Sequence, residues 1–290
     1  NGADVEETSS TSGAHRSGLL PPMYGNCVVQ RDGLLRELTT RARSAGIVCL
    51  YAPKGFGKTA LLLQYADSVR RDPARGFSEV IEAEGSTADE LAVQLRPYLD
   101  VRAAGESPLI AIDNVSLDQK EDIDRFVHTV RALRDAGYEL VLTCTPAKRA
   151  LVHALGDSVK INAQALTVHP REYSDWARTY TISSTLDVYG LTQGVPAIVA
   201  ALQVAVEGSD DLAASFESTI VDVYGSILVD MAQDDPELMR IACLMLLVGK
   251  GDLLELERAG FVCGSHMRSK LLRDYPVFGF DSSTLSFACL

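Results

Sequence analysis

The chain has 290 residues, 47% of them hydrophobic, which is enough to bury a large core in one main domain with one or two smaller ones. Its formal net charge of −12 and pI near 4.9 argue against direct nucleic-acid binding by this segment, because phosphate contacts need clustered Lys and Arg. The longest apolar run, Ile241 to Val248, is too short to cross a bilayer and no secretory signal opens the chain, so we expect a cytoplasmic protein with no membrane partner.

The cysteines show neither the paired spacing of a zinc site nor that of a redox motif. Two of them, Cys49 and Cys144, fall inside apolar strand-like runs, where a thiol packs as a small hydrophobic group. We therefore expect all six cysteines, at positions 27, 49, 144, 243, 263 and 289, to be reduced.

Residues 1–22 are mostly small and polar, which predicts a disordered tail. Because the chain does not begin with Met, we expect its native start to lie elsewhere. An amphipathic helix is predicted from Gly33 to Ala45. It leads into Ile47 to Tyr51, a short apolar run rich in strand-forming residues.

A phosphate-binding loop follows this strand. Two glycines let the backbone curl inward around phosphates, Lys58 is expected to reach the β and γ phosphates, and the Thr59 hydroxyl is expected to bind Mg²⁺. Ala52 replaces the first glycine of the usual pattern. A chance glycine-lysine-threonine turn would not explain the strand before it or the helical spacing from Thr59 to Val69. The residues predicted to bind nucleotide are Ala52, Pro53, Lys54, Gly55, Phe56, Gly57, Lys58, Thr59 and Ala60.

The second half of such a site is an acidic residue at the end of another buried strand. The apolar run from Leu109 to Ile112 predicts that strand, and Asp113 follows it as the expected Mg²⁺ partner, unless it only caps a turn. Asn114 stands where a second carboxylate often activates water, and an amide cannot take a proton. We place Lys58, Asp113 and Asn114 at the catalytic centre, and expect either another base or slow hydrolysis.

Strands and helices alternate through the first 170 residues. Thr87 and Glu90 form a capping-box pattern at one helix start, and Gly137 ends the next helix. The alternation predicts an α/β fold with a parallel sheet, helices on both faces and a ligand at the carboxyl ends of the strands. The further strands are predicted over 78–83, 138–144 and 164–168, and the helices over 87–99 and 120–136.

From about residue 171 the pattern becomes helical, with helices predicted over 172–179, 185–189, 196–206 and 211–232. Beyond Pro236, helices over 236–247, 253–257 and 265–272 and a hairpin over 276–281 and 285–290 are the parts of a winged helix. We predict four units: a tail (1–22), a P-loop nucleotide-binding domain (23–170), a helical domain (171–234) and a winged-helix-like domain (235–290).

Together these features resemble the signal-transduction ATPases with numerous domains (STAND), which include the NB-ARC-like switches and, most similar here, the ATPase part of large ATP-binding LuxR-type bacterial regulators. The similarity covers residues 24–290. Besides the phosphate loop, it rests on Leu191 to Ala197, which is similar to a glycine-any-proline motif, and on Val28 to Asp32, which is similar to an apolar-Gly-Arg-Glu element. The resemblance implies an ASCE-type P-loop sheet, with Arg31 near the adenine and Pro196 packed against it; the alternative, a proline that starts a helix, is compatible with that role.

Two departures from the family pattern bear on mechanism. Many members end the fourth strand with Thr or Ser and an Arg that senses the γ-phosphate, whereas this chain has Thr145 and then Pro146. Thr145 can still hydrogen-bond a phosphate, and Lys148 or Arg149 either replaces the missing charge or is a solvated residue at a helix start. His266 is the nearest candidate for a family histidine that contacts ADP, and an exposed histidine explains it better.

The resemblance implies a switch that binds ATP or ADP with Mg²⁺, hydrolyses ATP slowly, and controls domain packing in a bacterial transcription regulator. Self-association or a protein partner would then read out the nucleotide. The alternative is a nucleotide-stabilised scaffold without hydrolysis, which Asn114 and the absent sensor Arg favour. A nucleoside or small-molecule kinase would use the same loop, but the chain shows no acceptor site or arginine-rich lid.

Overall fold

The computed structural model describes residues 31–75, 77–99, 108–169, 171–172, 190, 192–207, 212–281 and 286–288. The predicted tail, the stretch from Val28 to Gln30 and most of the two helices predicted over 172–179 and 185–189 lie outside these residues. Within the described ranges, none of the helices has the length and apolarity needed to cross a membrane.

The first half of the chain forms a five-stranded parallel sheet in the order β2-β3-β4-β1-β5. This confirms the predicted α/β class and places β1, which leads into the phosphate loop, beside β4. Apolar residues make β1, β3 and β4 almost wholly buried, as expected for strands covered on both faces. The strands are β1 (Ile47–Tyr51), β2 (Ser78–Glu82), β3 (Leu109–Asp113), β4 (Glu139–Cys144) and β5 (Val159–Asn162).

The strand predicted over Gln164 to Val168 is wrong. The edge strand is instead β5, a few residues earlier, which pairs with β1. The side chain of Asn162 accepts a hydrogen bond from the backbone N–H of Ala165 at 3.1 Å and begins the one-turn helix α6 (Ala163–Leu166). A short, partly apolar segment such as this one fits a strand or a helical turn, and this cap selects the helix.

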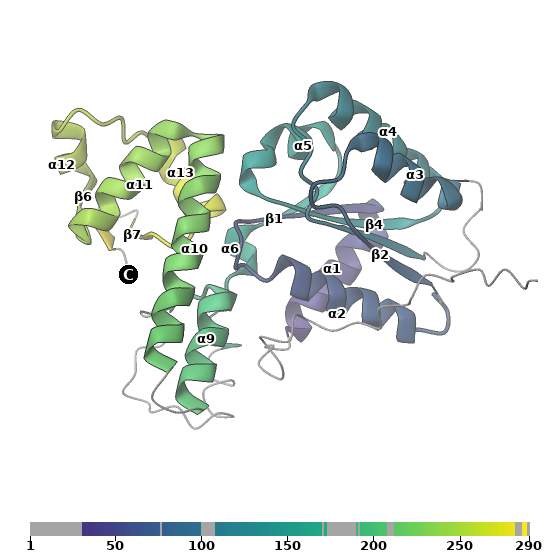
Figure 1. The fold of residues 1–290 in the computed structure, drawn as a ribbon, viewed down its shortest axis with the longest axis horizontal. Coiled ribbons are helices and arrows are strands. Elements are labelled where there is room, and N and C mark those ends of the chain that lie inside the picture. Colours follow the sequence, from purple (N-terminus) through teal and green to yellow (C-terminus); the bar gives the residue numbers. More distant parts are fainter. Residues whose placement is uncertain are drawn as a thin grey trace, which may run out of the picture.

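Helices cover both faces of the sheet (Figure 1). The predicted capping box is present at the start of α3, because the Thr87 backbone N–H donates to Glu90 Oε2 at 2.8 Å and the Glu90 N–H to Thr87 Oγ1 at 3.3 Å. One face carries α1 (Asp32–Ala45) and α2 (Lys58–Arg71), and the other carries α3 (Ala88–Leu99), α4 (Lys120–Asp135) and α5 (Arg149–Ala154), which the 3₁₀ turn η2 (Pro146–Lys148) precedes.

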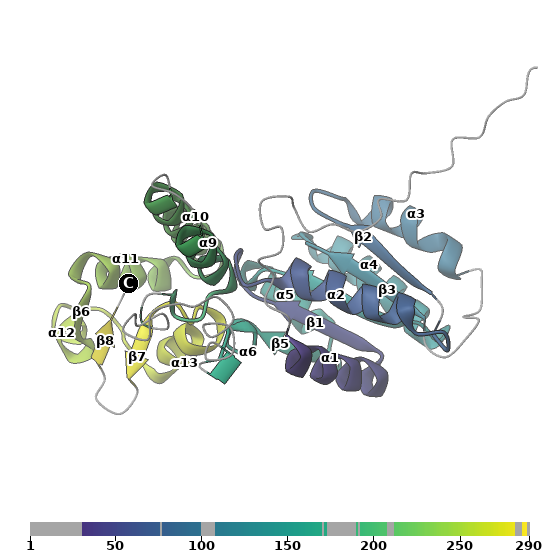
Figure 2. The ribbon, with the colours of Figure 1, turned by 90° about the horizontal axis from the view of Figure 1, so that it is seen from below.

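The second half is mainly helical and lies beside the sheet (Figure 2). The predicted terminal hairpin is present, since β7 and β8 pair antiparallel, and β6, which was not predicted, adds a third strand to it. The elements are α9 (Pro196–Glu207), α10 (Leu212–Asp234), α11 (Pro236–Val248), β6 (Lys250–Asp252), α12 (Leu253–Arg258), α13 (Ser265–Asp274), β7 (Gly279–Asp281) and β8 (Ser286–Ala288).

Two apolar cores lie on opposite faces of the sheet. As far as the described residues go, the core under α3, α4 and α5 is built from the first half of the chain, with residues such as Ile112 and Phe126. The core under α1 and α2 continues into the second half, where Val223 and Met231 of α10 and Leu271 of α13 belong to it. The phosphate loop, through buried Phe56, is part of this continuous core.

Candidate nucleotide-binding site

The phosphate loop connects β1 to α2 and packs tightly against the second half of the chain. Gly55 (φ 92°) and Gly57 (φ 73°) have left-handed backbones, which favour glycine. A Cβ at Gly55 would lie 3.1 Å from Val223 Cγ2 of α10, and one at Gly57 would lie 3.4 Å from Pro196 Cβ of α9. The two glycines therefore allow both the turn of the loop and the close approach of the two helices.

Lys58 begins α2 and is held by the loop itself. Its Nζ donates to the carbonyl oxygens of Ala52 at 2.6 Å and Pro53 at 3.0 Å. Burial lowers the pKa of Lys58, while the nearby Cys144 and Asp113 act in the opposite direction. The loop thus keeps a buried amine at the edge of a cavity, and among the described residues its hydrogen-bond partners are neutral carbonyls.

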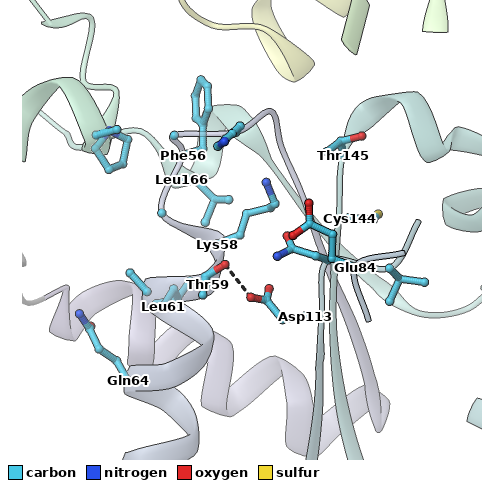
Figure 3. A pocket seen from close by; sticks show the side chains of 18 of the residues that line it. Phe56, Lys58, Thr59, Leu61, Gln64, Glu84, Asp113, Cys144, Thr145 and Leu166 are labelled. Atoms are coloured by element: carbon cyan, nitrogen blue, oxygen red, sulfur yellow. Dashed lines mark hydrogen bonds between the residues drawn. The ribbon is translucent and has the colours of Figure 1, made fainter. Parts of the chain in front are cut away.

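The carboxylate of Asp113 is fixed by two hydroxyl groups. Thr59 Oγ1 donates to Asp113 Oδ2 at 2.7 Å, as Figure 3 shows, and Thr143 Oγ1 donates to the other oxygen. Thr143 is fully buried, and its Oγ1 also accepts the backbone N–H of Asn114 at 2.8 Å. The structure thus brings the predicted pair Thr59 and Asp113 together. Their hydroxyl and carboxylate oxygens are the kind of ligand that Mg²⁺ prefers.

A cavity of about 600 Å³ lies in front of these residues. Its polar lining includes the loop from Lys54 to Ala60, with Asp113 and Asn114. Figure 3 shows Lys58, Thr59, Asp113 and Thr145 around the cavity. The apolar part of the lining consists of Leu61, Leu166, Val168, Pro196, Ala197 and Ala200.

Arg31 and Pro196, which the resemblance places near the adenine, both line the cavity. The Arg31 guanidinium donates to the carbonyl oxygens of Leu166 and Thr167, at 2.5 and 2.8 Å, and forms an ion pair with Glu172 at 3.2 Å. It therefore ties the start of α1 to the segment after α6. Contact of either residue with a base stays a prediction.

The residues proposed as substitutes for a sensor Arg have other partners. Thr145 lines the cavity as predicted. Lys148 also lines it, but its Nζ contacts Asp118 at 2.6 Å, and Arg149 lies 3.4 Å from both Asp234 and Asp274. His266 is exposed on α13 and lies outside the cavity lining.

The structure adds a carboxylate that the sequence did not single out, Asp230 of α10. Its Oδ1 accepts the backbone N–H of Ala147 at 3.4 Å, and its Oδ2 accepts the Tyr275 hydroxyl at 3.4 Å. Burial raises the pKa of Asp230, against the effects of Thr145 and the Lys58 ammonium. Only the packing of α10 against η2 brings Asp230 here, so no local sequence signal could have identified it.

Two other polar residues of the site were also missed. Thr143 alternates with apolar residues inside a strand pattern, and its role depends on the neighbouring strand β3. Glu82 ends β2 and lines the cavity together with Glu84. The available signal was the strand end itself, because the carboxyl ends of parallel strands meet at one edge of the sheet.

Solved structures with the same arrangement include a Walker-type ATPase of Pyrococcus abyssi, which is 13% identical with a TM-score of 0.52 over 90% of this chain and 93% of that one. The fold is that of a P-loop ATPase. A RuvB variant of Thermotoga maritima is 14% identical, with a TM-score of 0.43 over 90% of this chain and 92% of that one. Domain III of the Thermotoga maritima replication initiation protein DnaA is 16% identical, with a TM-score of 0.41 over 71% of this chain and 99% of that one. No protein-family model and no curated protein matches the chain.

Proposed function

We propose that this protein is an ATP/ADP-binding conformational switch with slow ATP hydrolysis. The observation that carries the proposal is that the phosphate loop is itself one of the contacts between the two halves of the chain. The backbone N–H of Ala197, in the first turn of α9, donates to Gly55 O at 2.9 Å, and Val223 of α10 packs on the same glycine. A ligand that reshapes the loop must also change how α9 and α10 pack on it.

The polar and apolar parts of the cavity lining suit the two parts of a nucleotide. Phosphates would replace the carbonyl partners of Lys58 and lie at the N-terminus of α2, where backbone N–H groups and the helix dipole favour negative charge. The apolar lining would receive the adenine against Pro196. Mg²⁺, held by Thr59 and Asp113, would neutralise charge on the phosphates when it is bound.

Asp230 gives the switch its expected direction. Its buried carboxylate lies close enough to Lys58 for the two charges to interact, and it accepts hydrogen bonds from Ala147 of η2 and from Tyr275, directly after α13. The γ-phosphate of ATP would bring further negative charge to this region, and like charges at short range repel. ADP should therefore favour the packing described here, and ATP should loosen α10 from the sheet.

We also propose a family and a domain arrangement: the chain is a STAND-type regulator with a helical domain and a winged-helix-like domain after the sheet. The α9–α10 pair and the three helices with the β6-β8-β7 sheet support this assignment. Loosening would expose surfaces for self-association or for a protein partner, and a bacterial transcription regulator is the proposed setting.

The proposal is tested by nucleotide binding and its effect on α9. ADP at a hundred times its Kd should stabilise the wild-type protein by about 2.7 kcal/mol, and Lys58→Ala should remove that stabilisation. Lys120→Ala, which removes an exposed lysine from the start of α4, is the matched control and should keep it. Hydrogen exchange of the first turn of α9 should be faster with ATP than with ADP. An unchanged thermal unfolding temperature with either nucleotide would overturn the proposal.

The second candidate is a nucleotide-stabilised scaffold that does not hydrolyse ATP. The specific observation in its favour is Asn114, an amide directly after the Mg²⁺-binding Asp113. Phosphate release distinguishes the two functions. Tight ADP binding without any turnover would support the scaffold, and turnover that Lys58→Ala abolishes would exclude it.

A further inference from the structure

Glu82 lies beside Asp113 because of the register between two neighbouring strands. It is the last residue of β2, and the register pairs it with Asp113 of β3. Because paired residues of neighbouring strands point to the same face of a sheet, the Glu82 carboxylate leaves the sheet on the face where Asp113 meets Thr59. Glu82 also lines the cavity. A second carboxylate thus stands one strand away from Asp113 instead of one residue after it.

The backbone at Asn114 explains why the carboxylate is not there. Asn114 has φ 57°, in the left-handed region that Asn tolerates and that costs most other residues about 1–2 kcal/mol. A glutamate at this position would be strained. Asn114 Nδ2 instead donates to Glu82 Oε1 at 3.3 Å. The amide therefore reaches across to β2 and holds the carboxylate that stands there.

The hydrogen bonds of Glu82 leave one oxygen for another partner. Its Oε1 accepts Asn114 Nδ2 and the backbone N–H of Glu84, both at 3.3 Å. Within the part of the chain that the structure describes, its Oε2 has no hydrogen-bond partner. By contrast, both oxygens of Asp113 are engaged by Thr59 and Thr143. Glu82 is thus the carboxylate at this end of the cavity that is both oriented and able to accept a further proton donor.

We propose that Glu82 is the general base for ATP hydrolysis in this protein and that Asn114 is its positioning residue. The inference rests on the proposed function. Water would attack the γ-phosphorus while its proton passes to the Glu82 carboxylate. The bond from the γ-phosphorus to the β–γ bridging oxygen breaks, and ADP leaves with that electron pair. Glu82 then returns the proton to solvent, so the products are ADP and inorganic phosphate.

The test compares Glu82→Gln with the wild-type protein. The amide keeps the size of the side chain and an oxygen for Asn114, but it cannot take a proton. Single-turnover phosphate release at saturating ATP and Mg²⁺ should fall by about 10²-fold or more, the usual contribution of a general base. The Kd for ADP, measured by calorimetry, should stay within about twofold. Glu82→Asp keeps the carboxylate and should retain more turnover than Glu82→Gln.

Two further variants separate this role from a structural one. Glu79→Gln changes the same residue type on the same strand, outside the cavity lining, and should leave turnover unchanged. Asn114→Ala should lower turnover in the wild-type protein but have no further effect in the Glu82→Gln protein, because it acts through Glu82. An additive loss would contradict the positioning role.

Each failure has a distinct meaning. Unchanged turnover in Glu82→Gln, or a loss seen in Glu84→Gln instead, would overturn the assignment while leaving nucleotide binding intact. Binding of ADP without any phosphate release by the wild-type protein would overturn it as well, and would favour the scaffold. Failure of the wild-type protein to bind ADP would overturn the proposed function itself.

Discussion

The sheet carries a buried polar cluster at each end, and the two clusters use the same elements differently. At the amino end, Tyr65 of α2, Glu139 of β4 and Arg75 contact one another. Tyr65 donates to Glu139 Oε2 at 2.8 Å, and Arg75 forms an ion pair with the same oxygen, while Glu139 Oε1 has no hydrogen-bond partner among the described residues. Burial raises the pKa of Tyr65 to about 12, so its hydroxyl stays a donor at neutral pH. We call this the closed cluster, because its cation and its carboxylate pair with each other.

At the carboxyl end, α2 contributes Lys58 and Thr59, and β4 contributes Thr143. Here the charged groups bond to hydroxyls and backbone carbonyls and face a cavity of about 600 Å³. A ligand oxygen can replace such partners, whereas the charges of Arg75 and Glu139 in the closed cluster already form an ion pair. The difference teaches that similar buried side chains secure the fold where they pair and create a site where they do not.

The largest effect is expected at the closed cluster. Arg75→Met leaves Glu139 buried without its cation, which should lower the free energy of unfolding by about 3–5 kcal/mol. Nucleotide affinity of the folded protein should not change. Urea unfolding and ADP calorimetry measure the two quantities. Adding Glu139→Leu to Arg75→Met removes the unpaired buried charge and should restore part of the lost free energy of unfolding. A loss below about 1 kcal/mol in Arg75→Met alone would contradict the view that the ion pair secures the fold.

A smaller effect, with a different signature, is expected at the open site. Thr143→Val keeps the shape of the side chain but removes the donor to Asp113 and the acceptor for the Asn114 N–H. Stability should fall by about 1–3 kcal/mol, the cost of unsatisfied buried polar groups. Unlike Arg75→Met, this change should also weaken Mg²⁺-dependent nucleotide binding. Thr143→Ser keeps the hydroxyl and should behave like the wild-type protein in both measurements.

The smallest effect concerns the pH dependence of stability and involves Asp230. Because burial raises its pKa above the usual 3.8, the favourable contribution of its protonated form is lost as the pH rises from about 4 through the raised pKa. Asp230→Asn cannot ionise. The variant should therefore gain stability relative to wild type between pH 4 and 7, as urea unfolding at several pH values would show. The opposite slope would mean that Thr145, Lys58 and the other partners outweigh burial.

Local pattern was enough to predict the phosphate loop, Asp113 and most helices, because spacing and caps act within a few residues. It failed where a single cap or a distant segment decides the outcome. The strand expected over 164–168 is replaced by β5 and α6, since one Asn162 cap outweighs apolar character. Glu82 and Asp230 reach the site only through strand register and helix packing. A local sequence pattern contains no information on strand register or on helix packing.

The hydrogen bond from Ala197 N–H to Gly55 O has a consequence for reversibility. The first amides of a helix have no partner inside it, so separating α9 from the loop exposes a donor that water can satisfy at once. The net value of such a bond is only about 0.5–1.5 kcal/mol. This bond therefore adds little to the free energy needed to separate α9 from the loop, and it can break and form again while the helix stays folded.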